Sequence, residues 1–130
     1  MRAGYEATKE YEKKGLYTHI NALGENLRTG LREVVEDLRI NAHITGCGSM
    51  TKLHLLTDRI DQSNLGSLRI HADGNAEKKY FHHLISRGIF AMAPTQVHFY
   101  VSLPHLDRQV ERTVSVTEDF LKSLGRGADA

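Results

Sequence analysis

An apolar stripe between residues 16 and 38 constrains the fold more than any other feature of this sequence. Its hydrophobic side chains recur every three or four positions, which is the spacing of one face of an α-helix about six turns long. The charged residues of this segment, Arg28 among them, lie mostly on the other side, and Thr18 is a suitable N-cap. The pattern therefore predicts a long helix with one buried face. The stripe consists of Leu16, Ile20, Leu23, Leu27, Leu31, Val34, Val35 and Leu38.

Two glycines, Gly24 and Gly30, lie inside this expected helix. Each costs about 1 kcal/mol of helix propensity relative to alanine. Close packing of another backbone against the helix would explain both positions.

Periodicity and turn signals predict the element order α-α-β-β-α-β-β-α in a single domain, residues 1–130. Such an order indicates an α+β fold, a small antiparallel or mixed sheet with helices packed on one face. The polar stretch Thr57–Gly74 predicts a surface loop, and residues 125–130 predict a frayed tail. Besides the long helix, the expected elements are helices at Ala3–Lys14 (closed by Gly15), Asn75–Arg87 and Asp107–Leu124, and strands at Ile40–Thr45, Met50–Leu56, Ile89–Met92 and Val97–Leu103.

Charge and composition exclude several classes of function. The formal net charge is only +1, from 17 basic and 16 acidic residues, so the chain lacks the basic excess of a nucleic-acid-binding protein. No apolar run reaches the roughly 18–20 residues that span a bilayer. The charged N-terminus has no apolar signal core, and the single cysteine, Cys47, cannot form an internal disulfide. We therefore expect a cytoplasmic protein.

Four segments carry a resemblance to a known family: KEYEKKGLYTHINALGENLRTGLREV, GCGSMTKLHL, SRGIFAMAPTQ and VSLPHLDRQVERTV. In this order and spacing they resemble the C-terminal small domain of class-III pyridoxal-phosphate aminotransferases, in particular the glutamate-1-semialdehyde aminomutases. Together they cover most of residues 3–124. The resemblance implies the small domain of fold-type-I pyridoxal-phosphate enzymes.

The same resemblance implies that the cofactor machinery lies elsewhere. In the family a larger, N-terminal domain supplies the Schiff-base lysine, the acid at the pyridinium nitrogen and the phosphate-binding loop, and Met1 falls where the small domain begins. We therefore expect a stand-alone or truncated C-terminal domain with no catalytic residues and no cofactor bound alone. The alternative is a non-catalytic binding or oligomerisation module. No cofactor-lysine motif surrounds Lys9, Lys13, Lys14, Lys52, Lys78, Lys79 or Lys122.

Two turns match the pocket edge of the family, where they would face the substrate side. The alternative for both is plain turn geometry at strand ends. The candidate residues are Gly46, Gly48, Ser49 and Met50 in one turn, and Pro94, Thr95 and Gln96 in the other.

Eight histidines raise the question of a metal site, but none is expected. No His-x₃-His pair shares a helical face, and a single cysteine cannot anchor zinc. His43 and His54 could meet across the hairpin, as could His54 and His98 if their strands pair. Cys47 has no neighbouring cation that would activate it, and Ser49 and Ser102 have no recognisable nucleophile context.

An exposed apolar strip predicts a partner, because large exposed apolar patches commonly mark interaction sites. We expect a homodimer or higher oligomer formed on this strip or on an unpaired sheet edge. A separate aminotransferase large domain is the other expected partner. The strip candidates are Tyr5, Tyr11, Leu16, Tyr17, Phe90, Met92 and Tyr100.

Overall fold

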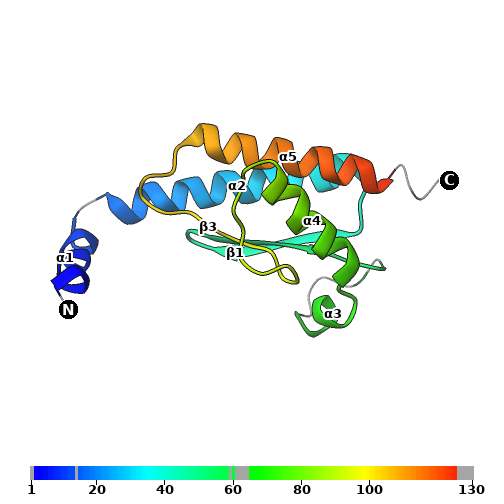
Figure 1. The fold of residues 1–130 in the computed structure, drawn as a ribbon, viewed down its shortest axis with the longest axis horizontal. Coiled ribbons are helices and arrows are strands. Elements are labelled where there is room, and N and C mark those ends of the chain that lie inside the picture. Colours follow the sequence, from blue (N-terminus) through cyan, green and yellow to red (C-terminus); the bar gives the residue numbers. More distant parts are fainter. Residues whose placement is uncertain (1, 14, 59, 61–64, 126–130) are drawn as a thin grey trace.

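Three antiparallel strands and five helices form the protein in a computed structural model that describes residues 2–13, 15–58, 60 and 65–125. The sheet has the order β1-β2-β3, and α2 and α5 lie side by side over one of its faces (Figure 1). The expected α+β fold is therefore confirmed. Gly125 of the expected tail is the last residue of α5, whereas Lys14 and the rest of the tail, 126–130, lie outside the described residues. The elements are α1 (Arg2–Tyr11), α2 (Leu16–Leu38), β1 (Ala42–Cys47), β2 (Met50–Leu55), α3 (Leu65–Ile70), α4 (Gly74–Ser86), β3 (His98–Tyr100) and α5 (Asp107–Gly125).

The apolar stripe of α2 is buried as expected: Leu23, Leu27 and Leu31 are at most 3% exposed. The helix begins at Leu16 with Gly15 as its N-cap, so Thr18 is not the cap. Gly15 has φ +94°, a left-handed conformation that glycine adopts without strain, and it starts α2 instead of closing α1. Helix α1 has no buried residue and projects away from the sheet (Figure 1).

The β1–β2 hairpin divides its side chains between two faces. Ala42, Ile44, Leu53 and Leu55 are buried toward the helices, and the residues that alternate with them point to the opposite face. The connecting turn is only Gly48-Ser49, with Gly48 at φ +56°. β2 begins at Met50 as expected, whereas β1 continues past Thr45 to Cys47, because a two-residue turn that uses a left-handed glycine is the tightest hairpin connection.

The expected strand at Ile89–Met92 is wrong. Only an isolated bridge joins Met92 to His98. Ala93 has φ +58° and Pro94 has no N–H to donate, so the backbone turns before a ladder can form. The expected strand at Val97–Leu103 is reduced to His98–Tyr100, which pairs with β2.

The polar stretch expected to be an irregular loop contains the short helix α3. The next helix, α4, begins at Gly74, and its N-cap is Asp73 instead of Asn75. The Asp73 carboxylate accepts hydrogen bonds from the backbone N–H groups of Asn75 (3.1 Å) and Ala76 (2.9 Å). None of the helices in the described part of the chain is long and apolar enough to cross a membrane.

The two glycines of α2 mark close contacts of different kinds. A Cβ atom at Gly24 would lie 2.1 Å from the carbonyl oxygen of Gly48 and 3.0 Å from the Cα of Ser49. The expected backbone contact is thus confirmed at Gly24. At Gly30 a Cβ atom would instead lie 2.8 Å from a methyl group of Val114 on α5, so this neighbour is a side chain.

We predict that Gly24→Ala lowers the free energy of unfolding by about 2 kcal/mol, because the hairpin backbone cannot yield without moving off α2. The gain in helix propensity, about 1 kcal/mol, only partly offsets this loss. Gly30→Ala is the matched control, and its effect should stay within about 1 kcal/mol since the Val114 side chain can turn aside. Urea denaturation of both variants measures the difference, and a Gly24→Ala protein as stable as the parent would contradict the contact.

Candidate functional site

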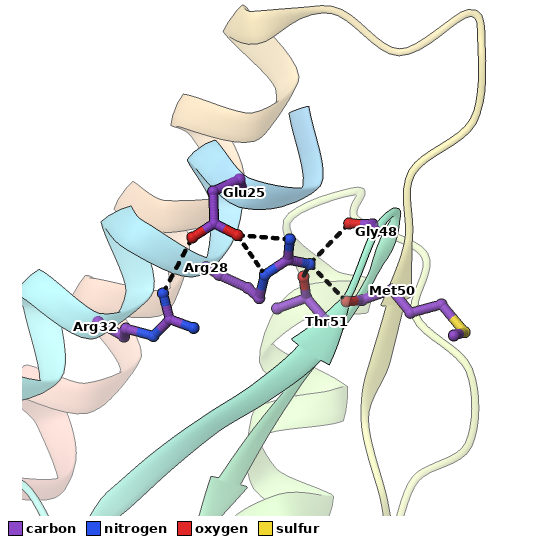
Figure 2. Close-up of polar contacts among 6 residues, drawn as sticks. All are labelled: Glu25, Arg28, Arg32, Gly48, Met50 and Thr51. Atoms are coloured by element: carbon purple, nitrogen blue, oxygen red, sulfur yellow. Dashed lines mark hydrogen bonds and ion pairs between the residues drawn. The ribbon is translucent and has the colours of Figure 1, made fainter. Parts of the chain in front are cut away.

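The first candidate turn, at the tip of the hairpin, is held against α2 by Arg28 (Figure 2). The guanidinium Nη1 donates to the carbonyl oxygens of Gly48 (2.8 Å) and Met50 (2.9 Å). Its other edge, Nε and Nη2, donates to Glu25 Oε2 at 3.1 and 2.7 Å. The turn therefore uses its backbone acceptors to bind α2.

Arg28 is only 4% exposed, although the sequence pattern assigns it to the polar side of the helix. Its hydrogen bond and charge hold the pKa of Glu25 below the usual value, with a smaller contribution from Arg32. The missed signal was Gly24, four residues earlier on the same helix face. A glycine that admits a neighbouring backbone also places that backbone's carbonyls beside the next turn of the helix.

The second candidate turn, Pro94-Thr95-Gln96, borders a cleft on the polar face of the sheet. Gln96 has φ +112° and Ala93 has φ +58°, conformations that cost a non-glycine residue about 1–3 kcal/mol each. The cleft has a volume of about 570 Å³ and contains Thr95 and Gln96 in its wall, but none of the candidates from the first turn. It is lined by Thr45, Lys52, His54, Leu68, Arg69, Ala72, Gly74, Glu77, Thr95 and Gln96.

Glu77 is the most deeply buried charged group of this cleft, at 3% exposure. Desolvation raises the pKa of its carboxyl group, while attraction to Lys52 and the backbone N–H of Gln96 act in the opposite direction. Glu77 is not among the site residues expected from the sequence. It lies three residues before the buried Tyr80, so helix periodicity alone places it on the inner side of α4.

The three histidines that were considered for a metal lie on this same polar face. His43 is paired with His54 across the hairpin, and their ring centroids are 6.5 Å apart. Burial, together with the charges of Lys52, His43 and His98, lowers the pKa of His54 to about 4. His54 Nε2 lies 2.8 Å from the Thr45 hydroxyl. Among the described residues, no group of three His, Cys, Asp or Glu side chains is placed to hold a metal ion.

The cleft also contains a lysine near a buried acid, which is part of what a pyridoxal-phosphate site requires. The other groups that line the cleft do not fit a phosphate or a pyridine ring. The N–H groups at the start of α4 are occupied by the Asp73 carboxylate, which would repel a phosphate. No Phe, Tyr or Trp side chain lines the cleft to stack on a pyridine ring. The described residues therefore provide no complete site for this coenzyme.

Two other sequence candidates are simple turn residues. Cys47 is exposed at the end of β1. Ser102 forms a local turn in which its N–H donates to His105 Nδ1 at 3.0 Å and its hydroxyl lies 2.8 Å from the same nitrogen. Within the described part of the chain, no carboxylate hydrogen-bonds to this histidine.

The expected apolar strip is only partly correct. Leu16 is buried at 9% exposure, where it starts the core side of α2. The other candidates are exposed but lie in two groups. Tyr5, Tyr11 and Tyr17 lie on α1 and the first turns of α2, whereas Phe90, Met92 and Tyr100 lie on and beside β3, the edge strand.

Comparison with known proteins finds similarity to glutamate-1-semialdehyde aminomutases in both sequence and structure. A glutamate-1-semialdehyde 2,1-aminomutase of Methanothermobacter thermautotrophicus is 30% identical over 125 residues, which are 95% of this chain and 29% of the relative. The corresponding protein of Alkaliphilus metalliredigens is 27% identical over 126 residues, 95% of this chain and 28% of the relative. No family model matches the chain.

The resemblance to the aminomutase family is confirmed. The crystal structure of a glutamate-1-semialdehyde aminomutase from Pseudomonas aeruginosa matches the fold with a TM-score of 0.74 at 23% identity, covering 86% of this chain and 24% of that one. An omega-transaminase from Sphaerobacter thermophilus matches with a TM-score of 0.68 at 25% identity, covering 82% and 24%. The chain thus spans less than a third of the length of these aminomutase and transaminase relatives.

We predict that Arg28→Lys lowers the free energy of unfolding by about 2–4 kcal/mol, because a lysine cannot bind both carbonyls and Glu25 at once. Arg32 lies on the same helix and also contacts Glu25, at 3.3 Å, but is largely exposed. Arg32→Lys is therefore the matched control and should change stability by less than about 0.5 kcal/mol. Chemical denaturation tests both, and equal effects of the two substitutions would show that the hairpin does not depend on the buried guanidinium.

Proposed function

We propose that this chain acts as the small-domain part of an aminomutase- or aminotransferase-like protein and does not catalyse a reaction by itself. The observation that carries the proposal is its partial match: the chain corresponds over 95% of its own length to 28–29% of its aminomutase relatives. The incomplete coenzyme site in the cleft supports the same view. In this proposal pyridoxal phosphate is held by another, lysine-bearing domain, in the cytoplasm.

The division of the sheet into two faces supports a role in completing a larger site. Helices α2 and α5 cover one face, whereas the opposite face carries a polar cleft beside a strained turn. In this proposal the turn at Pro94, Thr95 and Gln96 would face the substrate side of the complete enzyme. The turn at Gly46, Gly48, Ser49 and Met50 would keep the hairpin in position, through its contacts with Arg28.

A second copy of the chain is the partner that the exposed apolar residues favour. Phe90 and Tyr100 line the same small groove beside β3, and they are 83% and 50% exposed. β3 is the last strand of the sheet, but Met92 already bridges to His98 on its outer edge, so exposed apolar side chains and not strand pairing would form most of the contact. We therefore propose a homodimer formed at this edge, which would make the chain an oligomerisation module as well.

Titration with pyridoxal phosphate tests the proposed lack of catalysis. We predict that the 130-residue chain gives no saturable Schiff-base absorbance, because no lysine in the described residues combines with an acid and a free phosphate cradle. Lys52→Met and the exposed Lys78→Met serve as the matched pair. A stoichiometric absorbance that Lys52→Met abolishes and Lys78→Met retains would refute the proposal.

Size-exclusion chromatography with light scattering tests the dimer. We predict a mass twice the 14.6 kDa of one chain, and a shift to monomer for Phe90→Asp, because a buried charge at an interface is costly. Ile70→Asp introduces the same charge at an apolar side chain that is 80% exposed on α3, and it should leave the dimer intact. A monomeric parent protein would contradict the proposed partner.

A further inference from the structure

The cleft on the polar face of the sheet has the composition of a small-molecule site. Five separate elements contribute to it: both hairpin strands, α3, α4 and the turn at residues 94–96. Convergence of polar side chains from several elements on one concavity is typical of ligand sites. The volume of about 570 Å³ is also within the usual range for them.

Two cations line this cleft without a close ion pair among the described residues, although Lys52 attracts the Glu77 carboxyl group. Lys52 is half-buried on β2, and Arg69 reaches the rim from α3. Six ion pairs of Lys or Arg with a carboxylate are formed elsewhere in the described structure. Both cations have N–H donors that can bind an oxyanion, Lys52 in addition to its attraction for Glu77.

Glu77 provides a negatively charged hydrogen-bond acceptor at the bottom of the cleft. Glu77 is 3% exposed, and the backbone N–H of Gln96 helps to lower the pKa of its carboxyl group. An ionised carboxylate has about four acceptor positions on its two oxygens. It can therefore accept a further hydrogen bond from an O–H or N–H group of a ligand.

The oxyanion is better matched by a carboxylate than by a phosphate. A phosphate has three oxygens to satisfy, and the helix N–H groups that would serve it are already bonded to Asp73. A carboxylate needs fewer donors, which Lys52 and Arg69 can supply. For the second group a hydroxyl can donate to the Glu77 carboxylate without adding a third positive charge beside Lys52 and Arg69.

We propose that the cleft binds a small hydroxy carboxylate, with its carboxylate groups at Lys52 and Arg69 and its hydroxyl group donating to Glu77. This binding goes beyond the proposed role as part of an aminomutase-like protein and does not depend on it. It requires only the isolated chain, without coenzyme or partner.

The test is a set of NMR titrations of the full chain at constant pH and low ionic strength. The probes are L-malate, succinate, L-aspartate and inorganic phosphate; the first three differ only in whether a hydroxyl, a hydrogen or an ammonium group is present. We expect L-malate to shift the backbone amide signals of Lys52, Thr95 and Gln96 in a saturable way. Its affinity should exceed that of succinate by about tenfold, the value of one hydrogen bond to a charged group, and should also exceed that of the other two probes.

Substitutions then assign the contacts. Lys52→Met and Arg69→Met should each weaken L-malate binding by about tenfold or more. Lys78→Met removes the same charge next to Glu77 in sequence but outside the cleft, and it should have no effect. Glu77→Gln should reduce the preference for L-malate over succinate to about twofold or less, while succinate binds as well as before or better because a like charge is gone.

Three results would overturn the proposal. One is the absence of saturable shifts with L-malate in a parent chain whose spectrum shows it to be folded. Another is binding that Lys52→Met and Arg69→Met leave unchanged. The third is tighter binding of phosphate or L-aspartate than of L-malate, which would assign the cleft to a different ligand class. None of these outcomes bears on the pyridoxal-phosphate titration, so the two proposals fail separately.

Discussion

Direct contact between the hairpin backbone and α2 is the constraint on which the rest of the structure depends. The Gly48 carbonyl occupies the space that any side chain at position 24 would fill. This approach brings the carbonyls of Gly48 and Met50 within reach of Arg28 Nη1, while the other edge of the guanidinium is bonded to Glu25. The glycine at position 24 and the hydrogen-bonded, buried Arg28 are thus two parts of one interaction. Together they fix the position of the sheet relative to α2.

Once the hairpin is fixed, the two sides of the sheet have different roles. The inner side packs Leu53, Phe99 and their neighbours against the helices and supplies the apolar burial that stabilises the domain. The outer side does not contribute to this apolar core and can therefore carry polar groups. Strain at Ala93 and Gln96 is located on that outer side, where the chain turns back into β3. Such strain persists only where the surroundings over-determine the conformation, and at Gln96 the hydrogen bond to Glu77 contributes to this.

Much of the fold could be predicted from the sequence because its strongest signals are local. The period of the α2 stripe, the hairpin and the terminal helix starting at Asp107 all follow from patterns within a few residues. The strand expected at Ile89–Met92 failed because a bend at Ala93 and Pro94, and not the hydrophobic pattern, decides the pairing there. Helix α3 was missed because a six-residue helix is too short to show a period.

The candidate site was harder to predict, because it depends on residues distant in sequence. Thr95 and Gln96 were identified from the family resemblance, and they do line the cleft. Their neighbours Arg69 and Glu77 come from helices whose relative placement no local pattern reveals. Arg28 was missed for a related reason: helix periodicity describes which side of a helix is apolar, but it does not show that a neighbouring turn presents carbonyl oxygens.

The strict alternation of the hairpin has a consequence for how the chain folds. A slip of β1 against β2 by one residue would send His54 and Lys52 into the apolar interior and turn Leu53 and Leu55 out to water. Burying the polar side chains and exposing the leucines are both unfavourable. Misaligned hairpins are therefore unstable and do not persist as kinetic traps. The polar residues of the outer face thereby disfavour incorrect strand registers, independently of any ligand that they bind.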